Sequence, residues 1–178
     1  MRIVAGTHRG ARIFAPPGRD TRPTGDRVRE AAFNLIGPLG GASVLDLFAG
    51  SGAMGLEALS RGAERAVFVD SDRDACRAIE RNVAKLSLTG TRIVRQDALR
   101  FLAVERSTYD LVLVDPPYEM VESLQMRLAP YLEAVLAGDG LLVFESAAGI
   151  EPRLPLRTRT SRRYGSVRLT LFEHPSRA

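Results

Sequence analysis

A glycine-rich segment near residue 50 has the residue types and the spacing of a ligand-binding turn. Gly50, Gly52 and Gly55 spell the pattern G-x-G-x-x-G, in which glycines permit a tight turn and let the backbone approach a ligand at a helix N-terminus. Asp70 follows after roughly 20 residues, where an acid in such sites binds ribose hydroxyls. This pattern predicts a nucleoside cofactor and fits either NAD or S-adenosyl-L-methionine (SAM).

Two further acids favour SAM. Asp46 lies four residues before Gly50, where its carboxylate can meet the cationic methionine end of SAM, whereas an NAD site usually has an apolar residue there. Asp97 can accept a hydrogen bond from an adenine amino group, or it can cap the helix that follows, and the two roles can coexist. The residues predicted to bind SAM are Asp46, Phe48, Gly50, Ser51, Gly52, Asp70, Asp97 and Ala98.

A second cluster, Asp115-Pro116-Pro117-Tyr118, follows the apolar run Leu111–Val114. Two prolines cannot continue a sheet, and they stiffen the backbone just beyond the strand. Asp115 and the Pro116 carbonyl can accept hydrogen bonds from an exocyclic NH₂, while the Tyr118 ring can stack on a base. We therefore expect methylation of a base amino group, with these four residues as the catalytic set. Neither a metal nor a covalent intermediate is needed. A plain strand-terminating turn is the simpler alternative.

The elements that must position these residues alternate between short apolar runs and amphipathic stretches. This pattern is typical of βαβ units and a parallel sheet. The predicted strands are Ser43–Leu47, Arg65–Asp70, Arg92–Arg95, Asp110–Asp115 and Leu141–Glu145. The predicted helices lie near Ala53–Arg61, Arg73–Ser87, Ala98–Glu105 and Val121–Leu136. Arg157–Arg163 and Val167–Phe172 read as a C-terminal hairpin with a turn at Tyr164-Gly165.

The first 40 residues read as an extension. Arg2–Gly6 and Ala11–Phe14 predict a β-hairpin, and Thr24 is positioned to cap a helix that ends before Gly37-Pro38. We expect residues 1–40 to form this extension and residues 41–178 to form one α/β, Rossmann-like domain. Its sheet should be mostly parallel and seven-stranded, with the antiparallel hairpin at its C-terminal end.

The charge is unevenly distributed. Residues 1–29 and residues 151–178 each carry a net charge of +5, which leaves −6 on the centre of a chain whose total is +4. Basic ends suit a polyanion such as RNA or DNA, because each neutralised phosphate releases counterions. We expect the two ends to form one RNA-facing surface. A solvated arginine-rich surface is the alternative.

Composition limits the setting. A chain of 178 residues with 45% hydrophobic residues can build one sizeable core. No run is long and apolar enough for a membrane span or a signal peptide. Cys76 is the only cysteine, so disulfides and cysteine-based zinc sites are excluded, and this residue is expected to pack in a helix. We expect a cytoplasmic monomer that does not contact a membrane.

The two motifs together resemble the class I amino-methyltransferases that act on nucleic acid bases or on glutamine. Phe48 stands where the general SAM motif has its first glycine, a departure that this branch tolerates. Three N-terminal blocks make the resemblance more specific and are similar to the RsmD family of 16S rRNA guanine-N2 methyltransferases. These blocks are Ile3–Gly10, Arg22–Thr24 and Asp26–Glu30.

The resemblance implies transfer of the SAM methyl group to a guanine N2 of 16S rRNA, within the small ribosomal subunit or an assembly intermediate. It implies that Asp115, Pro116 and Tyr118 hold a flipped base. The arginines and the threonine expected to contact RNA or border the cleft are Arg9, Arg12, Arg22, Thr24, Arg27 and Arg29. Ordinary helix capping and surface charge are the alternative for these residues.

Three other functions compete with this interpretation. DNA adenine-N6 methyltransferases use the same Asp-Pro-Pro-Tyr chemistry, but they generally carry an inserted target-recognition region for which this chain has no spare length. A glutamine methyltransferase acting on protein would give the basic ends no evident purpose. A nucleotide-binding regulator without activity would leave Asp115–Tyr118 unexplained.

Overall fold

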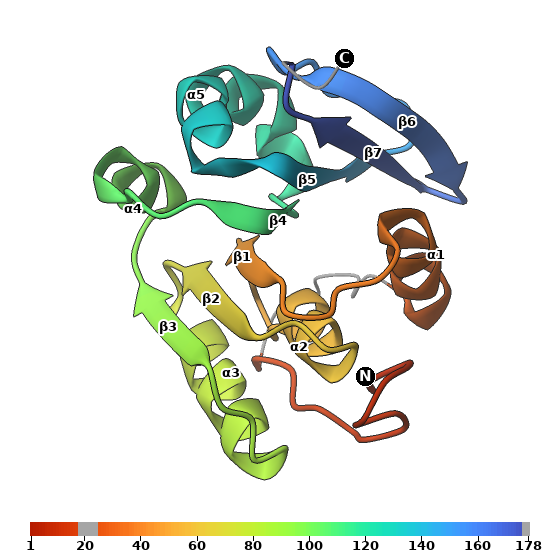
Figure 1. Cartoon of the computed structure of the whole chain (residues 1–178), viewed down its shortest axis with the longest axis vertical. Helices are drawn as coiled ribbons and strands as arrows, with labels where there is room; N and C mark the ends of the chain where they lie inside the picture. Colours follow the sequence, from red (N-terminus) through yellow and green to blue (C-terminus); the bar gives the residue numbers. More distant parts are fainter. Residues whose placement is uncertain (18–24, 176–178) are drawn as a thin grey trace.

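The computed structural model describes residues 1–17 and 25–175, without the side chain of Tyr118. Seven strands in this part form one sheet in the order β3-β2-β1-β4-β5-β7-β6 (Figure 1). The strands are β1 (Ser43–Leu47), β2 (Arg65–Asp70), β3 (Thr91–Arg95), β4 (Tyr109–Val114), β5 (Leu136–Ala147), β6 (Arg157–Tyr164) and β7 (Val167–Glu173). The helices are α1 (Asp26–Ile36), α2 (Ala53–Ser60), α3 (Arg73–Lys85), α4 (Ala98–Val104) and α5 (Val121–Val135), with a short 3-10 helix η1 (Tyr118–Met120).

The sheet is mostly parallel, as the sequence predicts. Neighbouring strands among β1 to β5 pair in parallel, whereas β7 runs antiparallel to both β5 and β6. The parallel strands therefore end at one edge, which we call the carboxyl edge, where Leu47, Asp70 and Val114 are the last strand residues. In such sheets ligands bind beyond this edge. The predicted fold class is confirmed.

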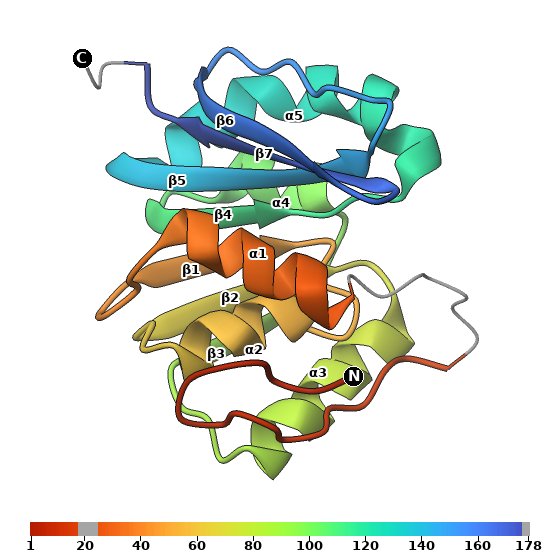
Figure 2. The ribbon, with the colours of Figure 1, turned by 90° about the vertical axis from the view of Figure 1, so that its right-hand side faces the viewer.

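Helices cover both faces of the sheet. Successive side chains of a strand point to opposite faces of the sheet. One set of apolar side chains packs against α1, α2 and α3, and the other set packs against α4 and α5. Phe68 of β2 belongs to the first cluster and Val67 to the second. Figure 2 shows α1 and α2 in front of the sheet. None of the described helices is long and apolar enough to cross a membrane.

Two predicted elements differ in the structure. The predicted N-terminal hairpin is present but shorter than predicted: one antiparallel bridge joins Arg2 and Arg12, and backbone hydrogen bonds pair Met1–Ile3 with Gly10–Ile13. Strand β5 begins at Leu136, five residues before its predicted start, because Leu136 pairs with Tyr109 across a register shift. A Cβ at Gly140 would lie 2.9 Å from the Tyr109 carbonyl oxygen, so glycine permits this close approach. Gly25 is the N-cap residue of α1, whereas Thr24 lies outside the described residues.

The N-terminal segment, residues 1–14, packs along α2 and α3. Ile3 is buried in the same cluster as Ala32 and Phe33 of α1. The turn of the segment lies by the C-terminal ends of α2 and α3, since the Thr7 amide donates to the Ser60 carbonyl and His8 Nε2 lies 3.0 Å from the Leu86 carbonyl oxygen. Both helix ends are at the edge opposite the carboxyl edge, which we call the amino edge.

A buried ion network fixes this segment to the helices. Glu57 of α2 is fully buried and accepts hydrogen bonds from the amides of Val4 (2.7 Å) and Ala5 (2.9 Å). It also pairs with Arg61 at 2.8 Å and with the fully buried Arg29 of α1 at 3.6 Å. Arg29 donates in turn to the Arg2 carbonyl and to Asp26. One carboxylate therefore joins α1, α2 and the N-terminal segment.

Replacing Glu57 with Gln should destabilise the protein by about 3–5 kcal/mol, because the change removes the buried carboxylate beside Arg29 and leaves only the partly exposed Asp26 as its opposite charge. Arg61→Gln is the matched control. Arg61 is partly exposed, and its loss should cost about 1 kcal/mol. Urea unfolding followed by circular dichroism measures both variants. Equal losses in the two would show that the Arg29–Glu57 pair does not anchor the segment.

Candidate functional site

The glycine segment forms a left-handed turn between β1 and α2. Phe48, Gly50 and Gly52 have φ values of 61°, 56° and 75°, a conformation in which glycine is unstrained and phenylalanine is not. Phe48 thus keeps the backbone form of the glycine it replaces. A Cβ at Gly50 would meet only the Phe48 carbonyl oxygen, at 3.9 Å, so the space above Gly50 is open to a ligand.

The third glycine has a different role from the first two. A Cβ at Gly55 would lie 2.3 Å from the Phe68 ring, so glycine is required there for packing α2 on β2. This arrangement matches the division of roles in the fingerprint, where the last glycine serves helix–strand packing. Gly52 is the N-cap residue of α2, so this helix begins directly at the end of the glycine turn.

Asp46 is buried beneath this turn, and its carboxyl group has an unusually high pKa. It is 3% exposed, and its Oδ2 accepts a hydrogen bond from the Gly55 amide at 2.9 Å. Burial raises the pKa of Asp46 to about 8, opposed by the Gly55 hydrogen bond and assisted by the negative charge of Asp70. A buried carboxylate in these surroundings is stabilised in its charged form by an added cation. The ammonium of a bound methionine group fits this requirement.

Asp70 and Asp97 stand at the ends of β2 and β3. The buried Asp70 accepts hydrogen bonds from the amides of Gly50 (2.8 Å) and Asp72 (2.9 Å), so it fixes the glycine turn against β2. A carboxylate has about four acceptor sites and can accept from several donors at once, ribose hydroxyls among them. Asp97 caps α4 by accepting from the Arg100 amide at 3.1 Å. This capping confirms one of the two roles that the sequence allows for Asp97.

The Asp-Pro-Pro-Tyr motif begins beside the glycine turn. Val114 of β4 pairs with Leu47 of β1, and the Asp115 amide lies 3.5 Å from the Leu47 carbonyl oxygen. Asp115 is half-buried, Pro116 is buried and Pro117 is exposed. The Met120 amide donates to the Pro117 carbonyl at 2.9 Å, which starts η1. Tyr118 is the first residue of η1, and its side chain lies outside the described part of the structure.

The arginines expected to contact RNA are dispersed in the structure. Arg27 is exposed in the first turn of α1, and Arg12 is exposed beside Lys85 of α3. Arg9 is exposed in the turn at the amino edge, away from Asp115. Arg29 is fully buried in the ion network with Glu57, so in this structure it supports the site from the interior. Arg22 and Thr24 lie outside the described residues.

The two basic ends lie on either side of α1. Figure 2 shows the N-terminal segment on one side of this helix and the hairpin of β6 and β7 on the other. The strand order contributes to this spacing, because it sets β6 at one edge of the sheet and β3, next to α3, at the other. The expectation that both ends face the same RNA stays a prediction.

Sequence reasoning missed Glu57 and Asn82. Asn82 of α3 is fully buried and donates to the carbonyls of Phe14 (2.9 Å) and Ser51 (3.0 Å), while its Oδ1 accepts from the Phe14 amide (2.7 Å). It thus joins the glycine turn to the N-terminal segment. Both residues carry a readable signal, since each is a polar side chain at a position where helical periodicity expects an apolar one.

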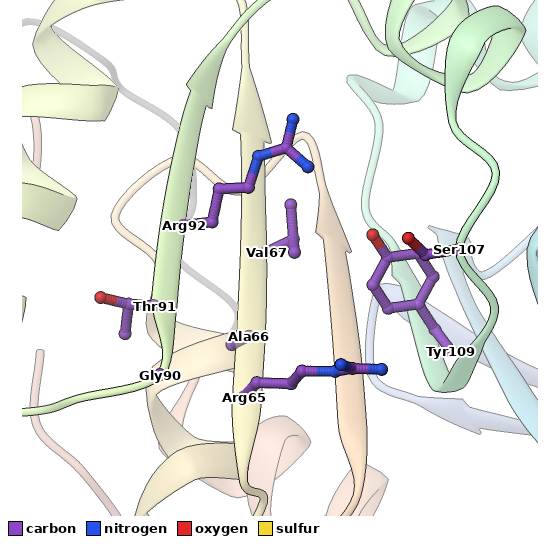
Figure 3. Close-up of a pocket in the computed structure, with 8 residues that line it drawn as sticks. All are labelled: Arg65, Ala66, Val67, Gly90, Thr91, Arg92, Ser107 and Tyr109. Carbon is purple, nitrogen blue, oxygen red and sulfur yellow. The ribbon is translucent and has the colours of Figure 1, made fainter.

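An open hollow of about 400 Å³ lies at the amino edge, between the start of β2 and the start of β4 (Figure 3). Its charged residues are Arg65 and Arg92, and Tyr109 closes one side. Arg92 lies 3.6 Å from Glu105, while Arg65 helps to hold the pKa of Asp110 below its usual value, after the larger effect of the Ser43 amide. The positive charge of the hollow is thus balanced locally, and the candidate site is at the other edge.

Comparison with known proteins agrees with this geometry. The model of the family described as Conserved hypothetical protein 95, the RsmD family, matches residues 1–173. The chain belongs to the RsmD family. It is 40% identical over 158 residues to YlbH of Bacillus subtilis, covering 85% of each protein. Over 119 residues it is 43% identical to ribosomal RNA small subunit methyltransferase D of Escherichia coli, covering 66% of this chain and 60% of that protein.

Solved structures agree with the family assignment. The structure of YhhF from Escherichia coli matches 98% of this RsmD-family chain and 97% of its own, with a TM-score of 0.84 and 34% identity. The fold is that of the class I SAM-dependent methyltransferases, and SAM is their cofactor. The open space above Gly50 and the buried carboxyl group of Asp46 fit this cofactor.

SAM affinity should rise with pH up to about pH 7.5. Asp46 has a pKa of about 8 in the free protein, so near pH 7 it is mostly protonated and must ionise to meet the SAM ammonium. The rise should be at most about tenfold per pH unit. Calorimetry at pH 7 in two buffers of different ionisation enthalpy should detect a released proton. Asp46→Asn should bind SAM more weakly and release none. Equal wild-type affinity at pH 6 and pH 7.5 would contradict this role.

The same carboxyl makes stability without SAM depend on pH. The folded pKa of Asp46 is above the ordinary value of 3.8, so folding favours its protonated form. The contribution of Asp46 to stability should be lost as pH rises from about 4 to about 8. Asp46→Asn should therefore raise the melting temperature more at pH 8 than at pH 5, as measured by thermal unfolding. An equal change at both values would argue against the raised pKa.

Asp70→Ala should reduce SAM affinity tenfold or more, because a hydrogen bond to a charged group contributes about 1.5–3 kcal/mol. Asp74→Ala is the matched control, since Asp74 is an exposed acid in the first turn of α3. Calorimetry on the folded variants compares the two. Unchanged SAM binding in Asp70→Ala would reject Asp70 as a cofactor residue.

Proposed function

We propose that this protein transfers the methyl group of SAM to the exocyclic N2 of a guanine in 16S rRNA. The finer assignment, guanine 966 in the small subunit or an assembly intermediate, follows from the family resemblance. The name of the Escherichia coli relative states small-subunit rRNA methylation for that protein, and membership of the same family supports SAM-dependent rRNA methylation here.

One observation carries the proposal. The β1–β4 pairing brings the acceptor cluster of Asp115 and Pro116 next to the glycine turn at Phe48–Gly52. A base amino group held by the first feature therefore lies beside a cofactor held by the second. The buried Pro116 and the bond between Met120 and Pro117 keep the cluster rigid. Rigid acceptors suit a reaction in which orientation supplies much of the rate.

SAM supplies an electrophilic methyl group when it is bound. The protein must orient the amine nitrogen, whose lone pair is delocalised into the base. We assign the Asp115 carboxylate and the Pro116 carbonyl as acceptors for the two N–H groups, which draws the lone pair toward the methyl group. This interaction strengthens as the nitrogen loses conjugation, so it favours the transition state over the ground state. The proton can leave to water after methylation, when the amine has become acidic.

RNA is the proposed partner of the exposed arginines Arg9, Arg12 and Arg27, through phosphate contacts. Phe14 adds an aromatic ring to the N-terminal surface, with Arg81 at 4.1 Å and Lys85 at 5.0 Å from its centroid. A mixed basic and aromatic surface suits single-stranded RNA. DNA adenine methylation remains the second candidate, because Asp115 and Pro116 would serve it equally well.

Asp115→Ala should lower the methylation rate constant by about 10²-fold or more, by analogy with the loss of a preorganised transition-state contact. SAM binding should persist. Tyr118→Phe should keep most activity, whereas Tyr118→Ala should lose roughly 1–3 kcal/mol of base stacking. Single-turnover methylation of small subunits that lack the modification measures these rates. A near-normal rate in Asp115→Ala would refute the mechanism.

Nucleoside analysis of rRNA from a deletion strain tests the substrate. The proposal expects loss of N2-methylguanosine from small-subunit rRNA and its return when the wild-type gene is restored. Unchanged N2-methylguanosine together with loss of N6-methyladenine from DNA would favour the second candidate.

A further inference from the structure

The tip of the β6–β7 hairpin lies beyond the carboxyl edge of the sheet. Val114, the last residue of β4, pairs with Phe144 of β5, and β5 continues to Ala147. Ala147 pairs with Val167, which in turn pairs with Tyr164 at the end of β6. At roughly 3.3 Å per residue, the hairpin extends about 10 Å past the level at which Asp115 begins. It therefore projects from the same edge of the sheet as the candidate site.

The tip is held rigidly in this place. Gly165 and Ser166 form a two-residue loop between Tyr164 and Val167, with Gly165 at a φ of 64°, as tight hairpins require. The Ser166 carbonyl accepts a hydrogen bond from the Ala148 amide at 2.9 Å, which ties the loop to the segment after β5. Tyr164 packs against the core cluster on the α1 side of the sheet. The backbone at the tip is therefore fixed, and with it the face of the sheet from which each side chain projects.

These side chains carry uncompensated positive charge. Arg162 and Arg163 are both exposed, and within the described residues neither forms an ion pair. Arg163 is directly opposite Arg168, a like-charge arrangement that destabilises a strand pair. Arg168 is held by Ser161 at 2.8 Å and by the exposed Glu151 at 3.5 Å, so it already has its own acceptors. Farther down β6, by contrast, Arg157 pairs with Glu173 at 2.8 Å.

We propose that Arg162 and Arg163 bind phosphates of the substrate RNA next to the target nucleotide. The inference rests on the proposed action on RNA. β6 is three strands from β4, about 14 Å away, a distance that a few nucleotides of single-stranded RNA can span. Arg162 shares a face with Leu169 on the α1 side, while Arg163 is on the opposite face with Arg168. The two guanidinium groups thus lie on either side of the hairpin tip, where the sugar-phosphate backbone of a bound RNA can contact both.

A structural explanation for the same charges is available. β6 is an edge strand, and charged side chains on an edge prevent pairing with other chains. That role would apply along the whole strand, where Arg159 is also exposed and forms no ion pair within the described residues; Arg162 and Arg163 differ from it in lying at the end that overhangs the candidate site. The two explanations predict different effects when the charges are removed.

The test is the double variant Arg162→Gln/Arg163→Gln in the full chain. Binding to polyuridylate is measured between 50 and 300 mM salt, at roughly five concentrations. Loss of two phosphate contacts should flatten the slope of log K against log salt by about 1.4, at roughly 0.7 per contact on single strands. SAM affinity should stay unchanged. The variant Arg162→Lys/Arg163→Lys keeps both charges and should keep most of the slope.

The matched control is Arg65→Gln/Arg106→Gln. Both arginines are exposed and lie at the amino edge, since Arg65 begins β2 and Arg106 precedes β4. The control removes the same charge and should leave the slope near the wild-type value. Equal slopes in the tip and control variants would overturn the proposal. So would a tip variant that self-associates in sedimentation while keeping the wild-type slope, because charge would then serve only to protect the edge.

Methylation of unmodified small subunits is measured in parallel, so that failure of this inference can be separated from failure of the proposed function. A flattened slope in a protein whose wild type does not methylate rRNA would support the RNA surface and reject the proposed activity. Normal wild-type methylation with an unchanged slope would reject the surface alone. If the tip variant loses affinity for subunits but not for polyuridylate, the tip meets a ribosomal protein, and the RNA assignment is wrong.

Discussion

The pairing of β1 with β4 is the constraint on which the candidate site depends. These strands lie side by side at the centre of the sheet although more than sixty residues separate them in the chain. Their parallel register brings Leu47 level with Val114, so the two loops that follow leave the sheet at adjacent points. Glycine flexibility in one loop and proline rigidity in the other then have complementary uses. The first adapts to a ligand, and the second holds acceptors still.

Much of this arrangement can be predicted from the sequence, because short apolar runs alternating with amphipathic stretches leave few alternatives to a parallel sheet. The prediction failed where local chemistry was ambiguous. Gly138-Asp139-Gly140 resembles a turn, yet it continues β5 because Tyr109 offers a partner that only the tertiary fold reveals. The ends of the predicted helices differ by a residue or two, as expected where helices fray.

For the site, strand-end acids and glycines could be located from the sequence, but their surroundings could not. Arg29 reads as one more arginine in a basic segment, and nothing local shows that Glu57 will meet it in the interior. The altered proton affinity of Asp46 likewise arises from burial beneath α2 and from the nearby Asp70, two consequences of folding. Net charge predicted a polyanionic partner, but the strand order and the contacts of Glu57 and Asn82 set where the charge lies on the molecule.

The side-chain amide of Asn82 links the glycine turn to the surface that we propose binds RNA. Its hydrogen bonds join the Ser51 carbonyl of the glycine turn to the backbone of Phe14, beside the basic and aromatic surface of the N-terminal segment. A ligand that restricts either partner lowers the entropy still to be lost when the other becomes ordered. Thermodynamic linkage makes such an effect reciprocal, so cofactor and nucleic acid would each tighten the binding of the other by the same factor. If both ligands bind as proposed, a single buried amide would thereby favour the ternary complex over either binary one.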